Sequence, residues 1–227
     1  MKNIILEKYN LSKNDIDILK DIDFSFDQNI SLIGTACSGK TSLLKVLEEE
    51  YQVPRIYKNY EFYNASVEDE LKYLILNNEQ KKIVQDLLPG VNLKSRPVDL
   101  KNKEKIKLSI LKALLHSKYI SFDNVLVYLE KKDKEYILDL LKKSKIKYII
   151  VSNDLNDLFY TDKTYILNDG KIIAYGDSDK MLLEERLLKR LGFKLPFMID
   201  LSIQLRDYRL INSIYLDKQK LIDRLWK

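Results

Sequence analysis

One short stretch of the chain has residue types and a spacing that suit phosphate chemistry. Residues 34–41 read Gly-Thr-Ala-Cys-Ser-Gly-Lys-Thr and match the full pattern G-x-x-x-x-G-K-[ST]. In such a loop, backbone N–H groups and the positive end of the next helix face anionic phosphates, the lysine reaches the outer phosphates, and the threonine hydroxyl binds Mg²⁺. A simple glycine turn would explain both glycines but not the adjoining lysine and threonine. We therefore predict a nucleotide site formed by Gly34, Thr35, Ala36, Cys37, Ser38, Gly39, Lys40, Thr41 and Ser42.

The segments around this loop must position it. Residues 29–33 are a short apolar run typical of a strand, and residues 42–47 have the pattern of a helix. A second nucleotide element should lie on a neighbouring strand, as an apolar run that ends in an aspartate of the Mg²⁺ site. Residues 119–123 provide that run and end at Asp123. An acidic residue after a strand often only begins a loop, but its place downstream of a complete phosphate loop favours a metal site formed by Thr41 and Asp123.

The rest of the chain alternates between strand and helix patterns. Residues 1–33 alternate as strands do, and Pro89-Gly90 interrupts apolar positions at helical spacing over 67–88. Further along, the pattern predicts helices at about 103–115 and 134–143, strands at 119–123 and 148–152, and a hairpin over 165–173 around Asn168-Asp169-Gly170. From residue 178 onward the pattern is mostly helical, with interruptions at Gly192 and Pro196. This order predicts an α/β fold with a mostly parallel sheet and flanking helices.

Composition excludes several classes of protein. The 227 residues are 45% hydrophobic and 32% charged, which is typical of a soluble globular protein, and no apolar run approaches the ~20 residues that span a bilayer. The single cysteine excludes an internal disulfide, and the single histidine, His116, leaves no histidine-rich metal site. The net charge of +5 comes from lysines dispersed among acidic residues, so a solvated surface is favoured over nucleic-acid binding. We expect a cytoplasmic protein.

The order of these motifs resembles an ATP-binding cassette (ABC) ATPase. Residues 64–70, Asn-Ala-Ser-Val-Glu-Asp-Glu, are similar to the segment after the glutamine loop in the ATPase subunits of energy-coupling-factor (ECF) transporters, which take up vitamins and metal ions. Residues 188–197, 201–205 and 220–225 are similar to the C-terminal extension of that group. Residues 1–177 would therefore form the ABC-type nucleotide-binding domain of a P-loop NTPase, with a helical subdomain at about 65–115 and a trimmed antiparallel β-subdomain.

The resemblance also implies partners and cofactors. ATP and Mg²⁺ would be bound, and the helical extension at residues 178–227 would contribute to dimerisation. A second ABC ATPase subunit would pair with this chain as a homodimer or a heterodimer, and a membrane-embedded subunit would receive the motion. The chain would then lie at the inner face of the cell membrane through its partners.

Two catalytic positions depart from the family pattern. Asn124 stands where a glutamate normally follows the metal-binding aspartate, and Asn153 stands where the family has its switch histidine. A neutral amide can orient a water molecule but cannot accept its proton, so weakened hydrolysis is expected. Whether the chain is an active ATPase therefore stays open.

The other family loops are altered as well. The signature loop, normally Leu-Ser-Gly-Gly-Gln, aligns with Leu100, Lys101, Asn102, Lys103 and Glu104. Asn102 and Lys103 add bulk where glycines allow close approach to the partner's ATP, and the two lysines add positive charge. Tyr9 is the candidate for the aromatic side chain that stacks on adenine, although a tyrosine in a strand is more often a packing residue. Cys37 replaces a glycine common in the family loop, and its thiol is expected to react with electrophiles.

The sequence leaves three functional hypotheses open. The first is a transporter motor subunit that binds MgATP and works with a more intact partner. The second is a nucleotide-binding scaffold, or regulatory half of a dimer, that hydrolyses little. The third is a different P-loop enzyme in which Asp154 or Glu130 supplies the catalytic carboxylate.

Overall fold

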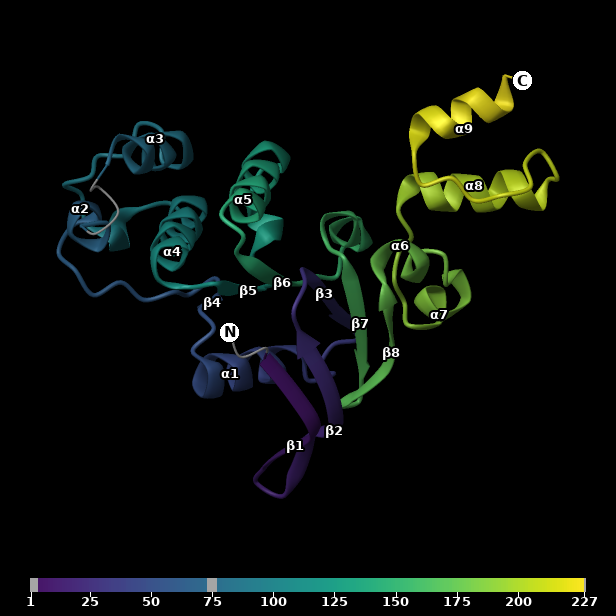
Figure 1. The fold of residues 1–227 in the computed structure, drawn as a ribbon, viewed down its shortest axis with the longest axis horizontal. Coiled ribbons are helices and arrows are strands. Elements are labelled where there is room, and N and C mark those ends of the chain that lie inside the picture. The colour runs from purple at the N-terminus through teal and green to yellow at the C-terminus, as the bar shows by residue number, and fades with distance from the viewer. Residues whose placement is uncertain (1–3, 73–76, 227) are drawn as a thin grey trace.

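A six-stranded sheet in the order β4-β5-β6-β3-β7-β8 forms the centre of the molecule in the computed structural model, which describes residues 4–72 and 77–226 (Figure 1). The first five strands of this order run parallel, and β8 runs antiparallel to β7. All five residues of β3 are buried because layers cover both faces of the sheet. The strands are β3 Ile30–Gly34, β4 Arg55–Ile56, β5 Tyr119–Asp123, β6 Lys147–Val151, β7 Lys163–Asn168 and β8 Lys171–Asp177.

The order of the strands corrects one detail of the sequence analysis. The strand that ends at Asp123 was expected to be a neighbour of the strand before the phosphate loop. In the structure β6 lies between β3 and β5 and pairs with both. Because β3, β6 and β5 run parallel, Asp123 at the end of β5 nevertheless lies at the same edge of the sheet as Gly34 at the end of β3.

The N-terminal segment forms a separate two-stranded antiparallel sheet. It consists of β1 Ile4–Lys13 and β2 Ile16–Phe26, both within the segment 1–33 where the alternating pattern predicted strands. The hairpin turns at Asn14 and Asp15, where φ is 51° and 60°, a conformation that these two residue types tolerate. Helix α1, Lys40–Tyr51, packs between this small sheet and the main one through Leu43, Leu44 and Leu47.

Helices cover the other face of the sheet near β4 and β5. They are α2 Val67–Glu70, α3 Asn78–Leu87, η1 Pro97–Asp99, α4 Asn102–His116, η2 Leu126–Tyr128 and α5 Lys131–Lys143. The bounds of α4 lie within one residue of the predicted ones, and those of α5 lie within three residues. The helical spacing over 67–88 does not correspond to one helix, because Asn77 caps a new helix by accepting a hydrogen bond from the Gln80 backbone N–H at 2.8 Å. Residues 73–76 lie outside the described residues.

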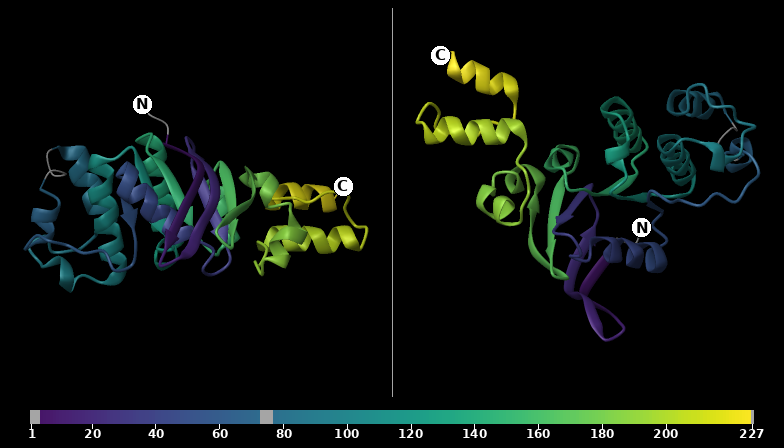
Figure 2. Two further views of the ribbon diagram at one scale, coloured as in Figure 1. Left: turned by 90° about the horizontal axis from the view of Figure 1, so that it is seen from below. Right: turned by 180° about the vertical axis from the view of Figure 1, so that it is seen from behind.

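The C-terminal segment packs beside β7 and β8, at the opposite end of the molecule from α2 and α3 (Figures 1 and 2). It comprises α6 Ser178–Met181, α7 Glu185–Arg190, α8 Phe197–Asp207 and α9 Lys218–Leu225, and η3 Leu155–Tyr160 lies between it and the sheet. Its apolar side chains share a core cluster with Ile33 and Ile166 of the sheet. Gly192 ends α7 with φ of 81°. In the part of the chain that the structure describes, no helix is long and apolar enough to cross a bilayer.

Candidate functional site

The candidate site lies where β3, β5 and β6 end. Gly34 ends β3, Asp123 ends β5, and Ser152-Asn153 directly follow β6. Ligands of open α/β sheets bind at the carboxyl ends of the strands, in the crevice that the loops leave. The parallel pairing thus brings together the three segments that the sequence marked as nucleotide elements.

The phosphate loop is held in a geometry that depends on its glycines. A Cβ atom at Gly34 would overlap with the carbonyl oxygen of Leu167, so a side chain has no room there. Gly39 has φ of 103°, a backbone conformation that L-residues rarely adopt, and it caps α1 at the point where Lys40 begins the helix. Residues 37–42 and Ile18 of β2 line an open pocket of about 270 Å³. The loop therefore forms a concave surface at the positive end of α1.

Lys40 occupies the inside of this loop. Its Nζ donates to the carbonyl oxygens of Gly34 at 2.9 Å and Thr35 at 2.6 Å, and to the hydroxyl of Ser38 at 3.1 Å. Burial lowers the pKa of Lys40, and the negative charge of Asp123 works in the opposite direction. When a nucleotide binds, the Lys40 ammonium can exchange these three oxygen acceptors for phosphate oxygens. This is the arrangement expected of the lysine in a phosphate loop.

The β7–β8 hairpin supports the loop from outside. Thr35 Oγ1 donates to Asn168 Oδ1 at 3.1 Å, and the Gly170 backbone N–H donates to the Ser38 carbonyl oxygen at 3.1 Å. The Lys20 N–H of β2 donates to the Gly170 carbonyl at 2.8 Å, so the small sheet joins the same network. The sequence identified Asn168-Asp169-Gly170 as a turn, which the antiparallel pairing of β7 and β8 confirms, but it contained no signal for this supporting contact.

The two residues predicted to form the metal site are in contact. Thr41 Oγ1 donates to Asp123 Oδ1 at 3.0 Å. A hydroxyl oxygen and a carboxylate oxygen at this distance are the kind of donors that Mg²⁺ takes alongside nucleotide phosphates. The side chains therefore fit the metal that the phosphate-loop pattern implies, and Thr41 and Asp123 are the residues that would hold it.

Arg55 also contacts the carboxylate of Asp123. The sequence did not predict this contact. Its Nη1 donates to Asp123 Oδ2 at 3.0 Å and its Nε donates to Glu48 Oε2 at 2.8 Å. Burial works to lower the pKa of Arg55, but the hydrogen bonds and charges of Glu48 and Asp123 outweigh it, so the pKa is raised. An arginine in a two-residue strand has no motif around it, and only the pairing of β4 with β5 brings it to Asp123.

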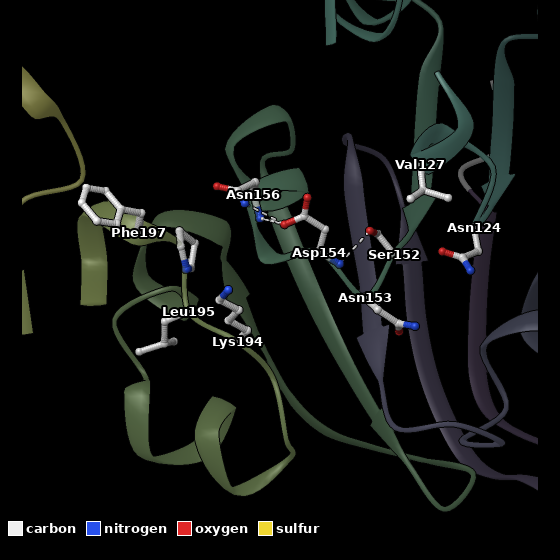
Figure 3. A pocket seen from close by; sticks show the side chains of 10 residues that line it. Asn124, Val127, Ser152, Asn153, Asp154, Asn156, Lys194, Leu195 and Phe197 are labelled. Carbon is white, nitrogen blue, oxygen red and sulfur yellow. Dashed lines mark hydrogen bonds between the residues drawn. The ribbon is translucent and has the colours of Figure 1, made fainter. Parts of the chain in front are cut away.

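Asn124 and Asn153, the two asparagines at the predicted catalytic positions, line a second pocket of about 570 Å³ (Figure 3). Asn124 has φ of 53°, which asparagine tolerates better than most residues, and its N–H donates to the Val151 carbonyl at 3.1 Å. The other lining residues are Val127, Ser152, Asn153, Asp154, Asn156, Lys194, Leu195, Pro196 and Phe197. Residues 194–197 come from the C-terminal segment, and the sequence analysis did not place them here.

The carboxylate of Asp154, which lines this pocket, caps the N-terminus of η3. Its Oδ1 accepts from the backbone N–H of Asn156 at 2.9 Å and from the Asn156 amide at 2.7 Å (Figure 3). Glu130, the other carboxylate considered as a base, accepts from Lys103 Nζ at 3.1 Å and does not line this pocket. Neither arrangement favours the third reading, a different enzyme class with one of these two bases.

The segment aligned with the signature loop lies at the start of α4. Lys101 precedes the helix, and its backbone N–H donates to Glu104 Oε2 at 2.8 Å, so Glu104 acts as a local cap. Residues 100–104 line neither the pocket at the phosphate loop nor the pocket at Asn124. The structure therefore does not bring this segment to the nucleotide elements of the same chain.

Tyr9 lies away from the phosphate loop. Its hydroxyl donates to Glu50 Oε1 at 2.6 Å, in the last turn of α1, and this hydrogen bond is the main reason that its pKa is raised to about 12. The loop is at the other end of α1, and ten residues of helix span about 15 Å. The role of Tyr9 in stacking on adenine therefore stays a prediction. Ile18 is the β2 side chain that lines the pocket there.

Cys37 offers a direct test of occupancy of the loop. The residue is exposed and has φ of 59°, which agrees with the glycine that the family commonly has at this position. We expect MgATP at ten times its dissociation constant to slow alkylation of Cys37 by N-ethylmaleimide about tenfold, because occupancy leaves about one site in eleven free. Mass spectrometry measures the rate. In Lys40→Ala the same MgATP concentration should give no protection, and equal rates with and without MgATP in the wild-type protein would contradict the placement of Cys37.

Comparison with known proteins places the chain in a class. No family model matches it. An ATP-binding subunit of an ABC transporter superimposes with a TM-score of 0.68 at 18% identity, over 84% of this chain and 95% of that one. The cbiO1 protein of Clostridium perfringens, part of the ABC transporter complex cbiONQ, superimposes with a TM-score of 0.61 at 18% identity, over 85% and 95% of the two chains. The chain thus has the fold of ABC-type nucleotide-binding domains.

Sequence relatives narrow the class further. The energy-coupling factor transporter ATP-binding protein EcfA1 of Mycoplasma mobile is 26% identical over 269 aligned positions, which cover 100% of this chain and 96% of that protein. The protein of the same name from Mesomycoplasma hyopneumoniae strain J is 26% identical and covers 92% and 91% of the two chains. Over most of its length, the chain is thus similar in sequence to ECF transporter ATP-binding proteins, the resemblance that its motifs and C-terminal segment indicated.

Proposed function

We propose that this chain binds MgATP as the ATP-binding subunit of an ECF-type transporter and couples nucleotide binding to uptake of a vitamin or metal ion. The observation that carries the proposal is the placement of Lys40 inside an intact phosphate loop beside the Thr41–Asp123 contact. Lys40 and the loop amides would bind the phosphates, and Thr41 with Asp123 would hold Mg²⁺, which supplies charge neutralisation on the phosphates.

Partners complete the proposed function. A second ABC ATPase subunit would supply the loop that closes over ATP, because residues 100–104 of this chain line neither of its own pockets. The C-terminal segment, residues 178–227, would contribute to that dimer, and residues 1–177 would form the nucleotide-binding domain with the helical subdomain at about 65–115. A membrane-embedded subunit would hold the pair at the inner face of the cell membrane.

Hydrolysis by this chain's own site would be weak. Asn124 and Asn153 line one pocket, and the nearby carboxylate of Asp154 is engaged in its own cap. No side chain at the Asn124 position can then take a proton from water, a step that contributes about 10²–10⁴-fold to catalysed rates. These same residues favour a second candidate function, in which the chain is a non-hydrolysing scaffold that binds ATP and regulates its partner.

One experiment separates the two candidates. Phosphate release is measured for the purified chain alone, for a partner ECF ATPase alone, and for the two together in the presence of the membrane subunit. A motor subunit should release little phosphate alone, but its complex should still release phosphate when the phosphate-loop lysine of the partner ATPase is replaced by alanine, because this chain's own site then turns over. A scaffold should give no release in that complex while the complex still assembles. Rapid release by the isolated chain, unchanged by Asp123→Ala, would contradict both.

A further inference from the structure

The carboxylate of the proposed metal site already has a cation on one of its two oxygens. Asp123 Oδ1 accepts from Thr41, and Oδ2 accepts from Arg55 Nη1 at 3.0 Å. The side chains of Arg55 and Asp123 are each only 11% exposed. Water therefore screens this pair less than it screens a surface ion pair, and the positive charge acts on the whole carboxylate.

Three contacts fix the guanidinium in place. Besides Asp123, it donates to Glu48 Oε2 of α1 at 2.8 Å, and its Cζ lies 4.3 Å from the ring centroid of Tyr57. Its backbone belongs to β4, where Arg55 pairs in register with Ser121 of β5, the strand that ends at Asp123. A planar guanidinium with two anionic partners and an aromatic ring against it has few other arrangements. These contacts hold the Arg55 guanidinium beside the Asp123 carboxylate.

A cation at this position has two opposite effects on ligands. A bare carboxylate beside the phosphate loop would repel the phosphates of metal-free ATP and attract Mg²⁺. Arg55 contacts Asp123 directly through Nη1, whereas Glu48 contacts the guanidinium at Nε, so the positive charge is the nearer one to Asp123. It offsets the repulsion of the phosphates and, for the same reason, reduces the attraction of the carboxylate for Mg²⁺. Both effects reduce the difference between binding ATP and binding MgATP.

We propose that Arg55 is a built-in counter-cation of Asp123, so that this chain binds ATP with little dependence on Mg²⁺. The inference rests on the proposed nucleotide site and specifies how that site is regulated: divalent metal does not decide whether this subunit is occupied. Arg55 is a positioning residue, because it acts on the ligands through the charge and orientation of Asp123.

The test is calorimetric titration of ATP into the full-length chain, with excess Mg²⁺ and with excess EDTA. The quantity compared is the ratio of the two dissociation constants, EDTA over Mg²⁺. For the wild-type protein we expect a ratio below about three, and for Arg55→Gln a ratio at least about tenfold higher, which is about 1.4 kcal/mol of coupling. Arg55→Lys retains the positive charge and should restore a ratio close to that of the wild-type protein.

Two further variants guard against misfolding and unspecific charge effects. Arg55→Gln leaves both Asp123 and Glu48 unpaired, so the double variant Arg55→Gln/Glu48→Gln removes a matched pair of charges and should also raise the ratio. Arg206→Gln breaks a different arginine–carboxylate pair, with Glu185 in the C-terminal segment, and should keep the wild-type ratio.

The outcomes separate the inference from the proposed function. A wild-type ratio above about thirty, or equal ratios in the wild-type protein, Arg55→Gln and the double variant, overturns the role of Arg55 while ATP binding stands. If the wild-type protein binds ATP in neither buffer, the proposed function fails and the inference fails with it.

Discussion

Replacing Lys40 with alanine is expected to weaken MgATP binding at least about 100-fold, because hydrogen bonds to charged groups contribute about 1.5–3 kcal/mol each and the ammonium would make more than one. Lys40 is the cation inside the loop, held by two carbonyl oxygens and a hydroxyl that phosphate oxygens would replace. Without it, the loop offers only backbone N–H groups and the end of α1 to a triphosphate. Calorimetry with the purified chain measures the loss.

A lysine on the same helix serves as the matched control. Lys45 is exposed on α1 outside the loop, so Lys45→Ala removes one positive charge and should change the affinity less than about threefold. Thermal unfolding of both variants shows whether the helix is intact. If Lys40→Ala binds MgATP as tightly as Lys45→Ala does, the nucleotide is not held by this loop, and the proposed function is wrong.

The second large effect concerns Asn124, the position after the proposed metal-site aspartate. In a complex with a partner ATPase, Asn124→Glu is expected to raise ATP turnover at this chain's site by about 100-fold, since a carboxylate can accept the proton of the attacking water. The backbone opposes part of this gain. Asn124 has φ of 53°, and a residue other than glycine, asparagine or aspartate is strained there by about 1 kcal/mol.

A glutamine at the same position separates chemistry from strain. Asn124→Gln has the length of glutamate and the same backbone penalty but no charge, so it should leave turnover at the level of the unmodified chain. Phosphate release by the complex under single-turnover conditions is the measurement. Equal turnover for the glutamate and glutamine variants would assign the defect to Asn153 or to residues 100–104 instead of Asn124.

The contiguous motifs were predicted well because their geometry is local. The phosphate loop is a strand, a turn that needs glycine and a helix, and the structure has these as β3, Gly34 and Gly39, and α1. Residues 119–123 form a strand as predicted, and the turn at Asn168-Asp169-Gly170 joins two antiparallel strands. The α/β fold with a mostly parallel sheet is confirmed. Capping at Asn77 divided the segment at 67–88, which apolar spacing alone could not anticipate.

The amino-acid sequence by itself determined which residues are proposed to carry the phosphate chemistry and which of the predicted catalytic positions hold amides, because both depend only on residue type and short-range spacing. Tertiary structure alone decided the surroundings of those residues. Arg55 reaches Asp123 across 68 positions of chain, the β7–β8 hairpin supports the phosphate loop, and residues 194–197 line the pocket at Asn124. Such contacts depend on strand order and register, which place distant segments side by side and leave no local pattern in the chain.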